Sequence, residues 1–252
     1  MKLIEDLYSG GILPIVLHKV VIEKKSEWED VHLSTFCKML EYIGDRWIIP
    51  QMGDTRNNSG WVLTFDDGNL SDYELVFPLL LEKEIKATFF LIANKIGTNG
   101  YLNWSQVKEM HRNGMCIASH SLSHRKMTML SKKEAIRELI DSKKILEDFI
   151  SAPVLSFSYP YGECNAETHQ LGIDAGYNFL FTSRHGVLKK LSNIFPRNSI
   201  NSTMSWLDVV NVISPSVKTK LKCHLEDLAK DSIKNIIGQE NYIQLRNKYI
   251  DK

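Results

Sequence analysis

The sequence predicts an α/β fold, a distorted (β/α) barrel of about seven strands, and three observations support this. Short β-branched or apolar runs alternate with amphipathic stretches along most of the chain, as in strand and helix units around a parallel sheet. Candidate functional side chains follow the ends of those runs, where the sites of such barrels gather. The length of 252 residues suits one large domain, and no internal boundary is visible in the sequence.

The expected strands are apolar or β-branched runs that are too short for helices and are bounded by polar or turn-forming residues. These runs lie at residues 12–18, 61–65, 87–92, 115–119, 154–158 and 178–182. The runs at residues 12–18 and 61–65 are expected to be buried strands.

The expected helices have caps and apolar faces. They cover residues 34–42, 71–84, 104–113, 131–150 and 166–175. Ser34 is predicted as the N-cap of the first helix, and Pro78 interrupts or restarts the second. Gly114 and Gly176 end two of the others.

The alternation fades after Arg197, and residues 205–238 are predicted to be mainly helical with a break near Pro215. We therefore expect one catalytic domain over residues 1–252, in which residues 203–252 form a mainly helical C-terminal extension.

The overall charge excludes several partners. The chain has 31 basic and 30 acidic residues, a formal net charge of +1, so nothing favours nucleic acid or an anionic membrane. No transmembrane segment is expected because no apolar window reaches membrane-spanning length. Glu5 and Asp6 interrupt the stretch that a secretory signal would need to be apolar, so the expected location is cytoplasmic.

Two adjacent carboxylates end the predicted strand at residues 61–65. Asp66 and Asp67 would raise each other's pKa unless a cation or hydrogen-bond donors compensate, so such a pair indicates a metal site or an acid/base site. The alternative is structural: Asp67-Gly68 forms a turn and Asp66 caps the next helix.

Two histidines four residues apart follow the predicted strand at residues 115–119. His120 and His124 can share one face of a helical turn, which lets two imidazoles reach one ion. With one carboxylate they would leave positions open for water or substrate. Histidines that are merely solvated on the surface are the alternative explanation for this spacing.

Two further features, residues 159–162 and His18, indicate a functional site only in combination with the aspartate and histidine pairs. Tyr159-Pro160-Tyr161-Gly162 follows the predicted strand at residues 154–158 and offers aromatic side chains suited to sugar rings, although an ordinary turn has the same composition. His18 ends the first predicted strand, where a lone histidine is usually structural.

In combination these motifs resemble the polysaccharide deacetylase (NodB-homology, carbohydrate esterase 4) family. The resemblance rests on Thr64-Phe65-Asp66-Asp67-Gly68, Ile85-Lys86-Ala87-Thr88-Phe89-Phe90-Leu91, His120-Ser121-Leu122-Ser123-His124 and Tyr159-Pro160-Tyr161-Gly162, in that order. It extends from about Leu13 to Arg197. The run Leu13-Pro14-Ile15-Val16-Leu17-His18 is similar to the start of the circularly permuted branch that includes poly-N-acetylglucosamine deacetylases.

The resemblance implies a distorted (β/α) barrel that binds one divalent metal ion, zinc in the first place, with nickel, cobalt, iron or manganese as alternatives. It implies the metal ligands Asp67, His120 and His124, with Asp66 as general base and His18 as acid. For the substrate side it implies Ser121, which would brace the histidine loop, together with Tyr159, Pro160, Tyr161 and Gly162, where the backbone N–H of Tyr161 would bind the oxyanion.

One position departs from the family pattern. Family members often carry an arginine in the third motif that orients the base, and Ser158 stands at the matching place here. Arg197 is a candidate substitute whose position the sequence does not fix.

The resulting prediction is a metal-dependent hydrolase that removes an acyl group, N-acetyl in the first place, from an acylated sugar or glycan, acting on a C–N bond other than a peptide bond. One alternative is a deformylase or O-deacetylase of a lipid- or nucleotide-linked sugar. Another is a glycan-binding protein without turnover, which the missing third-motif arginine favours.

Overall fold

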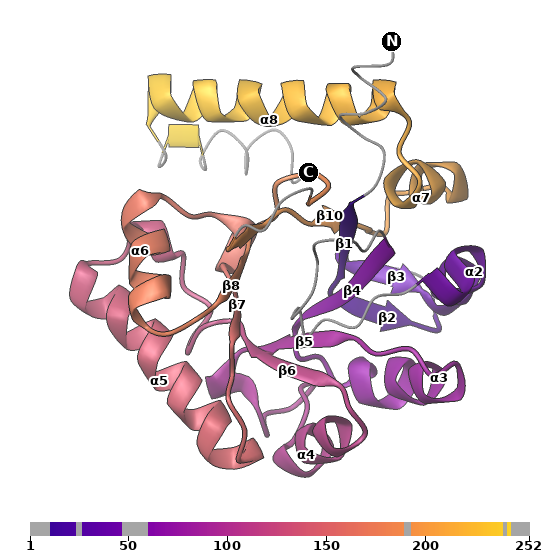
Figure 1. Cartoon of the computed structure of the whole chain (residues 1–252), viewed down its shortest axis with the longest axis horizontal. Helices are drawn as coiled ribbons and strands as arrows, with labels where there is room; N and C mark the ends of the chain where they lie inside the picture. Colours follow the sequence, from indigo (N-terminus) through magenta and orange to yellow (C-terminus); the bar gives the residue numbers. More distant parts are fainter. Residues whose placement is uncertain (1–10, 24–26, 47–59, 189–192, 239–240, 243–252) are drawn as a thin grey trace.

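The main feature is one curled, entirely parallel sheet with helices on its outer side (Figure 1). The structure, a computed structural model, describes residues 11–23, 27–46, 60–188, 193–238 and 241–242. Within these residues the sheet has eight strands, which confirms the distorted barrel and adds one strand to the expected number. In pairing order they are β10 (Asn198–Ser199), β1 (Ile12–Leu17), β4 (Gly60–Asp67), β5 (Thr88–Leu91), β6 (Cys116–Ser119), β7 (Ser156–Ser158), β8 (Phe179–Phe181) and β9 (Ile194–Phe195).

The two edge strands of this sheet follow each other in the chain. β9 pairs with β8 and β10 pairs with β1, and only Pro196 and Arg197 separate β9 from β10. The edges of the sheet must therefore meet at these two residues, and the sheet curls almost into a closed barrel. A separate pair of short parallel strands, β2 (Lys19–Val21) and β3 (Asp30–His32), lies beside it.

The helices cover the outside of the sheet (Figure 1). They are α2 (Leu33–Ile43), α3 (Phe77–Glu82), α4 (Trp104–Arg112), α5 (Lys132–Ile150), α6 (Ala166–Asp174), α7 (Trp206–Ile213) and α8 (Val217–Ile237). α8 runs across the top of the view. None of the helices in the described part of the chain is long and apolar enough to span a bilayer.

Most predicted elements are confirmed within a few residues, and the differences have local causes. α2 begins one residue earlier than expected because the His32 side chain, not that of Ser34, accepts the capping hydrogen bond. The segment before Pro78 forms a π-helical turn, Asp72–Val76, and α3 restarts at Phe77 with proline in its first turn. The break near Pro215 separates α7 from α8.

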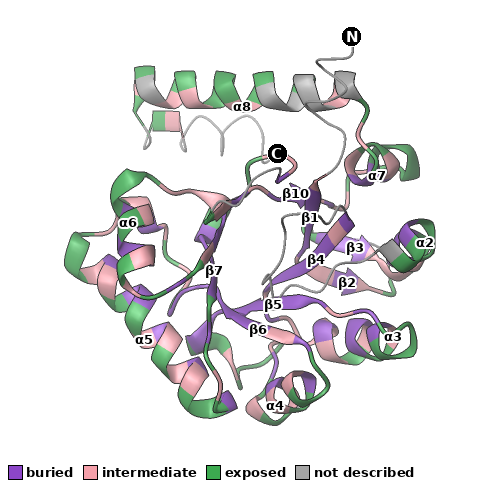
Figure 2. Ribbon diagram, in the orientation of Figure 1, coloured by how far each residue is buried: buried purple, intermediate pink, exposed green. Residues whose placement is uncertain are grey.

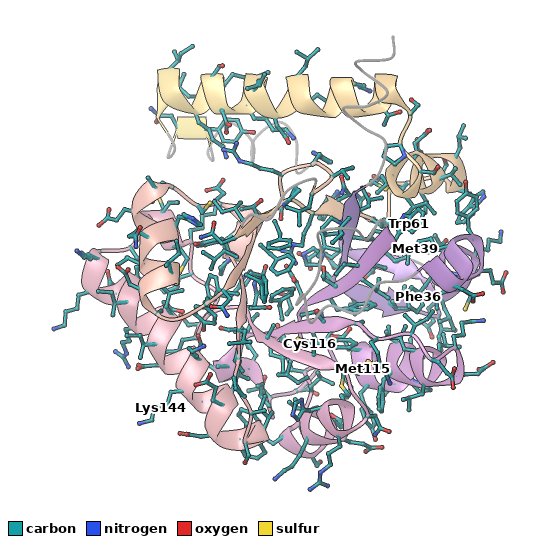
Figure 3. The ribbon with its side chains drawn as sticks, in the orientation of Figure 1. Phe36, Met39, Trp61, Met115, Cys116 and Lys144 are labelled. Carbon is teal, nitrogen blue, oxygen red and sulfur yellow. The ribbon has the colours of Figure 1, made fainter. Side chains whose placement is uncertain are left out.

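The sheet separates two apolar layers, because successive side chains of a strand point to opposite faces. The larger layer lies between sheet and helices and includes Phe36 and Met39 of α2 (Figure 3). The smaller layer fills the barrel interior and contains Val62, Phe90 and Ala118. Figure 2 shows the strands as the buried part of the molecule and the outer faces of the helices as the exposed part.

This alternation decides which functional side chains face inward. On β4, Val62 belongs to the interior layer, so Thr64 and Asp66 follow it on the same face at a period of two. On β6, Ala118 is interior, which places His120 on that face just beyond the strand end. The sequence thus builds a hydrophobic barrel floor with polar groups above it.

Candidate metal and catalytic site

The site residues gather because parallel strands end at the same edge of the sheet. Asp67 pairs in register with Leu91, and Leu91 pairs with Ser119, the residue before His120. Leu17, the residue before His18, pairs with Phe65, the residue before Asp66. Three separate chain segments therefore deliver polar side chains to one place.

Asp67, His120 and His124 converge as the sequence predicts. The Nε2 atoms of His120 and His124 each lie 3.5 Å from Asp67 Oδ1. One potential ligand atom from each of the three residues lies within 4.8 Å of the other two. The set of two imidazoles and one carboxylate therefore has the donor types and the spacing of a site for a divalent transition-metal ion.

The protonation states of these residues also suit a cation. Burial lowers the pKa of His120 to about 3, so its imidazole is neutral. His120 Nδ1 donates to the carbonyl oxygen of Ser158 at 2.8 Å, which leaves the Nε2 lone pair facing Asp67. Burial, reinforced by the charge of Asp66, raises the pKa of Asp67 to about 8.

Asp67 Oδ1 is the atom that tests whether an ion fits. It is buried and has no hydrogen-bond partner among the described residues, although two imidazole nitrogens face it. A buried carboxylate oxygen in this position is costly unless a positive charge neutralises it. The described residues therefore fit a divalent ion between Asp67 and the two histidines.

The histidine pair lies on a loop and not on the helical turn that its spacing suggested. Residues between β6 and the next helical turn adopt no regular structure, and both Ser121 and His124 have left-handed backbone conformations with φ of 68° and 60°. Ser121 Oγ accepts a hydrogen bond from the backbone N–H of His124 at 2.9 Å. Ser121 thus braces this loop as the family resemblance implies, but it is fully buried and does not face a substrate.

Asp66 has the opposite environment from that of Asp67. Arg197 binds it through two parallel hydrogen bonds, Nη1 to Oδ1 at 2.6 Å and Nη2 to Oδ2 at 2.7 Å. Burial opposes ionisation of Asp66, but the charge of Arg197 and its hydrogen bond outweigh this effect and hold the pKa of Asp66 well below its usual range. Asp66 is therefore a carboxylate at neutral pH, and it does not cap the following helix.

Arg197 is the residue that the sequence could name but not place. Its side chain is fully buried at the seam between β9 and β10, and its guanidinium lies over the rings of Phe90 at 5.2 Å and Phe181 at 5.8 Å. Ser158, at the position of the missing third-motif arginine, accepts from Arg197 Nη2 at 2.6 Å and donates to Asp66 Oδ2 at 3.1 Å. The guanidinium thus reaches Asp66 from a different strand.

His18 lies at the rim of the same site. Burial lowers its pKa, and its Nδ1 has no hydrogen-bond partner among the described residues. Three potential ligand atoms lie within 4.8 Å of one another: a ring nitrogen of His18, a carboxylate oxygen of Glu29 and a carboxylate oxygen of Asp67. Sequence reasoning missed Glu29, because it lies in a polar segment with no motif and reaches the site only through the β2–β3 connection.

The loop at residues 159–162 is placed only partly as predicted. Tyr159 is fully buried and its hydroxyl donates to the Thr168 carbonyl at 3.2 Å, so this tyrosine and the buried Pro160 are part of the packing and cannot stack on a sugar. Tyr161 is 53% exposed, has a left-handed φ of 61°, and its ring lies 4.9 Å from that of His124. Gly162 follows it in a left-handed conformation with φ of 67°.

The arrangement has the donor types for a divalent ion on one side and an ionised carboxylate on the other. Comparison with known proteins shows the family. Residues 53–180, just over half of the chain, match the polysaccharide deacetylase family, and the protein belongs to that family.

Two relatives indicate the kind of family member. The chain is 30% identical over 140 residues to a peptidoglycan-N-acetylglucosamine deacetylase of Bacillus cereus, which covers 55% of this chain and 61% of that protein. It is 25% identical over 185 residues to a poly-β-1,6-N-acetyl-D-glucosamine N-deacetylase of Staphylococcus aureus, which covers 68% of this chain and 62% of that protein. The chain spans 46%, 61% and 62% of the length of three of the curated relatives that it matches.

A solved structure shares the fold. The deacetylase PplD of Streptococcus pyogenes, determined in complex with acetate, superimposes with a TM-score of 0.72 at 22% sequence identity, over 81% of this chain and 99% of that one. The curled parallel sheet is therefore a NodB-type fold, as the sequence motifs predict.

Proposed function

We propose that this protein is a metal-dependent deacetylase that removes N-acetyl groups from a polysaccharide containing N-acetylglucosamine. The observation that carries the proposal is the pairing of two adjacent carboxylates with different partners, Asp66 with Arg197 and Asp67 with His120 and His124. Family membership and the substrates named for the two relatives support the same activity.

The proposed ion site consists of Asp67, His120 and His124. A divalent ion bound there would supply a Lewis acid for the acyl carbonyl and lower the pKa of a nearby water molecule. The residues contribute neutral imidazoles, one of them oriented by the Ser158 carbonyl, and a carboxylate oxygen that lacks a partner of its own. Zinc is the ion we expect from this donor set.

Asp66 is the proposed general base. Arg197 keeps it ionised, and His120 Nε2 lies 3.7 Å from its Oδ2, so the base stands directly beside the proposed ion site. Asp66 accepts the proton of the attacking water as the carbon–oxygen bond forms. The backbone N–H of Tyr161, on the exposed loop next to His124, would donate to the oxyanion that develops on the acyl group.

His18 is the proposed general acid. A ring nitrogen of His18 lies within 4.8 Å of a carboxylate oxygen of Asp67, so a sugar bound beside the proposed ion site would bring its leaving nitrogen near this imidazole. To give a proton to that nitrogen as the carbon–nitrogen bond breaks, His18 must first be protonated, and because burial lowers its pKa this step is favoured as pH falls; acetate and a free amine then leave. The buried Arg197 supplies the guanidinium that Ser158 lacks, which removes the feature that favoured a binding-only role.

The decisive experiment measures acetate release from N-acetylglucosamine oligomers with β-1,4 and with β-1,6 linkages. The protein is loaded with zinc, and Asp66→Asn serves as the matched control. We expect the wild type to release acetate. The rate of Asp66→Asn should be lower by a factor of about 10² to 10⁴, while this variant still binds one zinc ion.

Three results would contradict this proposal in different ways. If Asp66→Asn loses its zinc, the division between base and metal ligands is wrong. If zinc-loaded wild type releases no acetate from either oligomer, the substrate is a different acylated sugar or the protein only binds glycans. If metal removal leaves the rate unchanged, the reaction does not need the ion.

A further inference from the structure

The loop that carries His120 and His124 has a conformation that its own residues disfavour. Both Ser121 and His124 are in the left-handed region, where a side chain crowds the backbone. Two such residues within four positions persist only where surrounding contacts fix them. The loop therefore depends on partners outside itself.

The partner that stands out is Glu138 on α5, which no motif of the sequence brought forward. Its side chain is buried, and both of its oxygens accept hydrogen bonds from one residue of the loop. Oε2 accepts from the backbone N–H of Ser123 at 2.8 Å, and Oε1 accepts from the Ser123 hydroxyl at 2.5 Å. Ser123 directly precedes His124.

The same face of α5 also holds the start of the loop. Ser142 lies one helical turn after Glu138 and its hydroxyl is 2.8 Å from that of Ser119, the last residue of β6. Ser119 Oγ in turn accepts from the backbone N–H of Ser121 at 3.2 Å. One helix face thus fixes the chain on both sides of His120.

We propose that Glu138 is a positioning residue for the metal site: it holds the strained loop so that His124 Nε2 faces Asp67. The inference rests on the proposed function, because positioning matters only if His124 binds the ion. A carboxylate is suited to the task because it accepts from a backbone N–H and a hydroxyl at once, and its charge strengthens both bonds. A glutamine has one oxygen for the backbone N–H and would have to donate its amide N–H to the Ser123 hydroxyl, and it lacks the charge that strengthens both bonds.

The test compares Glu138→Gln with Asp141→Asn, an exposed acid on the same helix that pairs with Arg137. Zinc affinity is measured by competition with a chelator, and hydrogen exchange of residues 120–126 is measured in the metal-free protein. Partners that orient metal ligands typically change affinity by about 10- to 100-fold. We expect Glu138→Gln to weaken zinc binding about tenfold and to speed exchange in this segment, while Asp141→Asn leaves both unchanged.

Saturating zinc gives a second readout that a general loss of stability would not produce. Because the ligands themselves are intact, kcat of Glu138→Gln should return toward the wild-type value at high zinc concentration. Ser123→Ala keeps the backbone N–H bond to Glu138 and loses only the hydroxyl, so it should weaken zinc binding by less than Glu138→Gln. This variant also serves if Glu138→Gln does not fold.

The proposal is overturned if Glu138→Gln binds zinc as tightly as the wild type, or if it only lowers the melting temperature and leaves affinity and local exchange unchanged. If the wild type itself binds no zinc, the metal dependence in the proposed function fails. Hydrogen exchange of residues 120–126 then still tests whether Glu138 holds the loop. Equal exchange in Glu138→Gln and the wild type would show that it does not.

Discussion

The two sides of the site solve the problem of a buried carboxylate differently. On the arginine side, formed by Asp66, Arg197 and Ser158, every charge has a partner from the chain itself. On the histidine side, formed by Asp67, His120 and His124, the carboxylate meets only neutral rings and keeps an unpartnered oxygen. The pKa of the first carboxyl is lowered and that of the second is raised to about 8.

This difference indicates which side is complete and which needs something added. On the arginine side the charges of Asp66 and Arg197 neutralise each other without any bound ion. This side should therefore behave as a structural ion pair that also keeps the proposed base ionised. The histidine side gains its missing charge only from a bound cation. Two neighbouring residues of one strand can thus serve as base and ligand because their surroundings, and not their chemistry, differ.

The largest effect is expected from Arg197→Met, which leaves the Asp66 carboxylate buried without a cation. Breaking one partner of a buried pair typically costs about 3–5 kcal/mol of unfolding free energy. Urea unfolding of the metal-free protein measures this loss. The double variant Asp66→Asn with Arg197→Met should be more stable than Arg197→Met alone, and the absence of such recovery would show that the pair does not act as a unit.

The next effect is a pH dependence of opposite sign on the two sides. Because the pKa of Asp67 in the folded protein, about 8, lies above its unfolded value near 4, the metal-free protein should lose stability as pH rises from about 4 to 8. Asp66 behaves conversely: its pKa is lowered by folding, so its contribution is present above about pH 4 and is lost at lower pH.

Asp67→Asn isolates this effect. We expect it to raise the unfolding free energy of the metal-free protein by several kcal/mol at pH 8, with little change at pH 4. Urea titrations at both pH values provide the measurement, with Asp66→Asn as the comparison. A metal-free Asp67→Asn protein that is less stable than the wild type at pH 8 would contradict the assignment of an unsatisfied charge to the histidine side.

A smaller effect, on rate alone, is expected from His18→Asn. His18 lies close to Asp67 and Glu29, but it is not one of the proposed ion ligands and it is not the proposed base. Its loss should lower kcat about 100-fold while zinc affinity stays unchanged. Equal loss of zinc affinity and rate would place His18 among the ligands and extend the histidine side.

The smallest effect is expected from Ser158→Ala on the arginine side. Ser158 Oγ joins Arg197 and Asp66, but their direct bidentate contact remains without it. The expected cost is about 1 kcal/mol of unfolding free energy and a few-fold decrease in kcat. A loss as large as that of Arg197→Met would mean that the serine, and not the guanidinium alone, maintains the pair.

Much of the fold and of the proposed ligand set could be predicted from the sequence. Short apolar runs and helix-ending glycines such as Gly114 locate strands and helices because they act locally. Asp67, His120 and His124 come together because each follows a parallel strand, and strand ends meet at one edge of the sheet. Their convergence therefore needs no knowledge of individual contacts.

What the sequence could not supply depends on contacts between distant segments. Arg197 reaches Asp66 only because the edges of the curled sheet meet beside it, and Glu138 reaches Ser123 across a helix and a loop. The burial of Tyr159 depends on the packing of α6 over β7, so an aromatic residue suited to sugar became part of the core. The four-residue spacing of the histidines suggested a helical turn, but left-handed residues at 121 and 124 form a loop instead.

Gly162 limits how the rim of this barrel could be redesigned. A β-carbon built there would lie 2.2 Å from the Ser183 side chain and 2.5 Å from its backbone nitrogen, so even alanine would have to displace a neighbouring strand connection. Its neighbour Tyr161 is half exposed, but its ring contacts His124 and its backbone is left-handed. Variation of the rim is therefore confined to side chains at position 161 that accept a left-handed backbone, and it requires that Gly162 is kept.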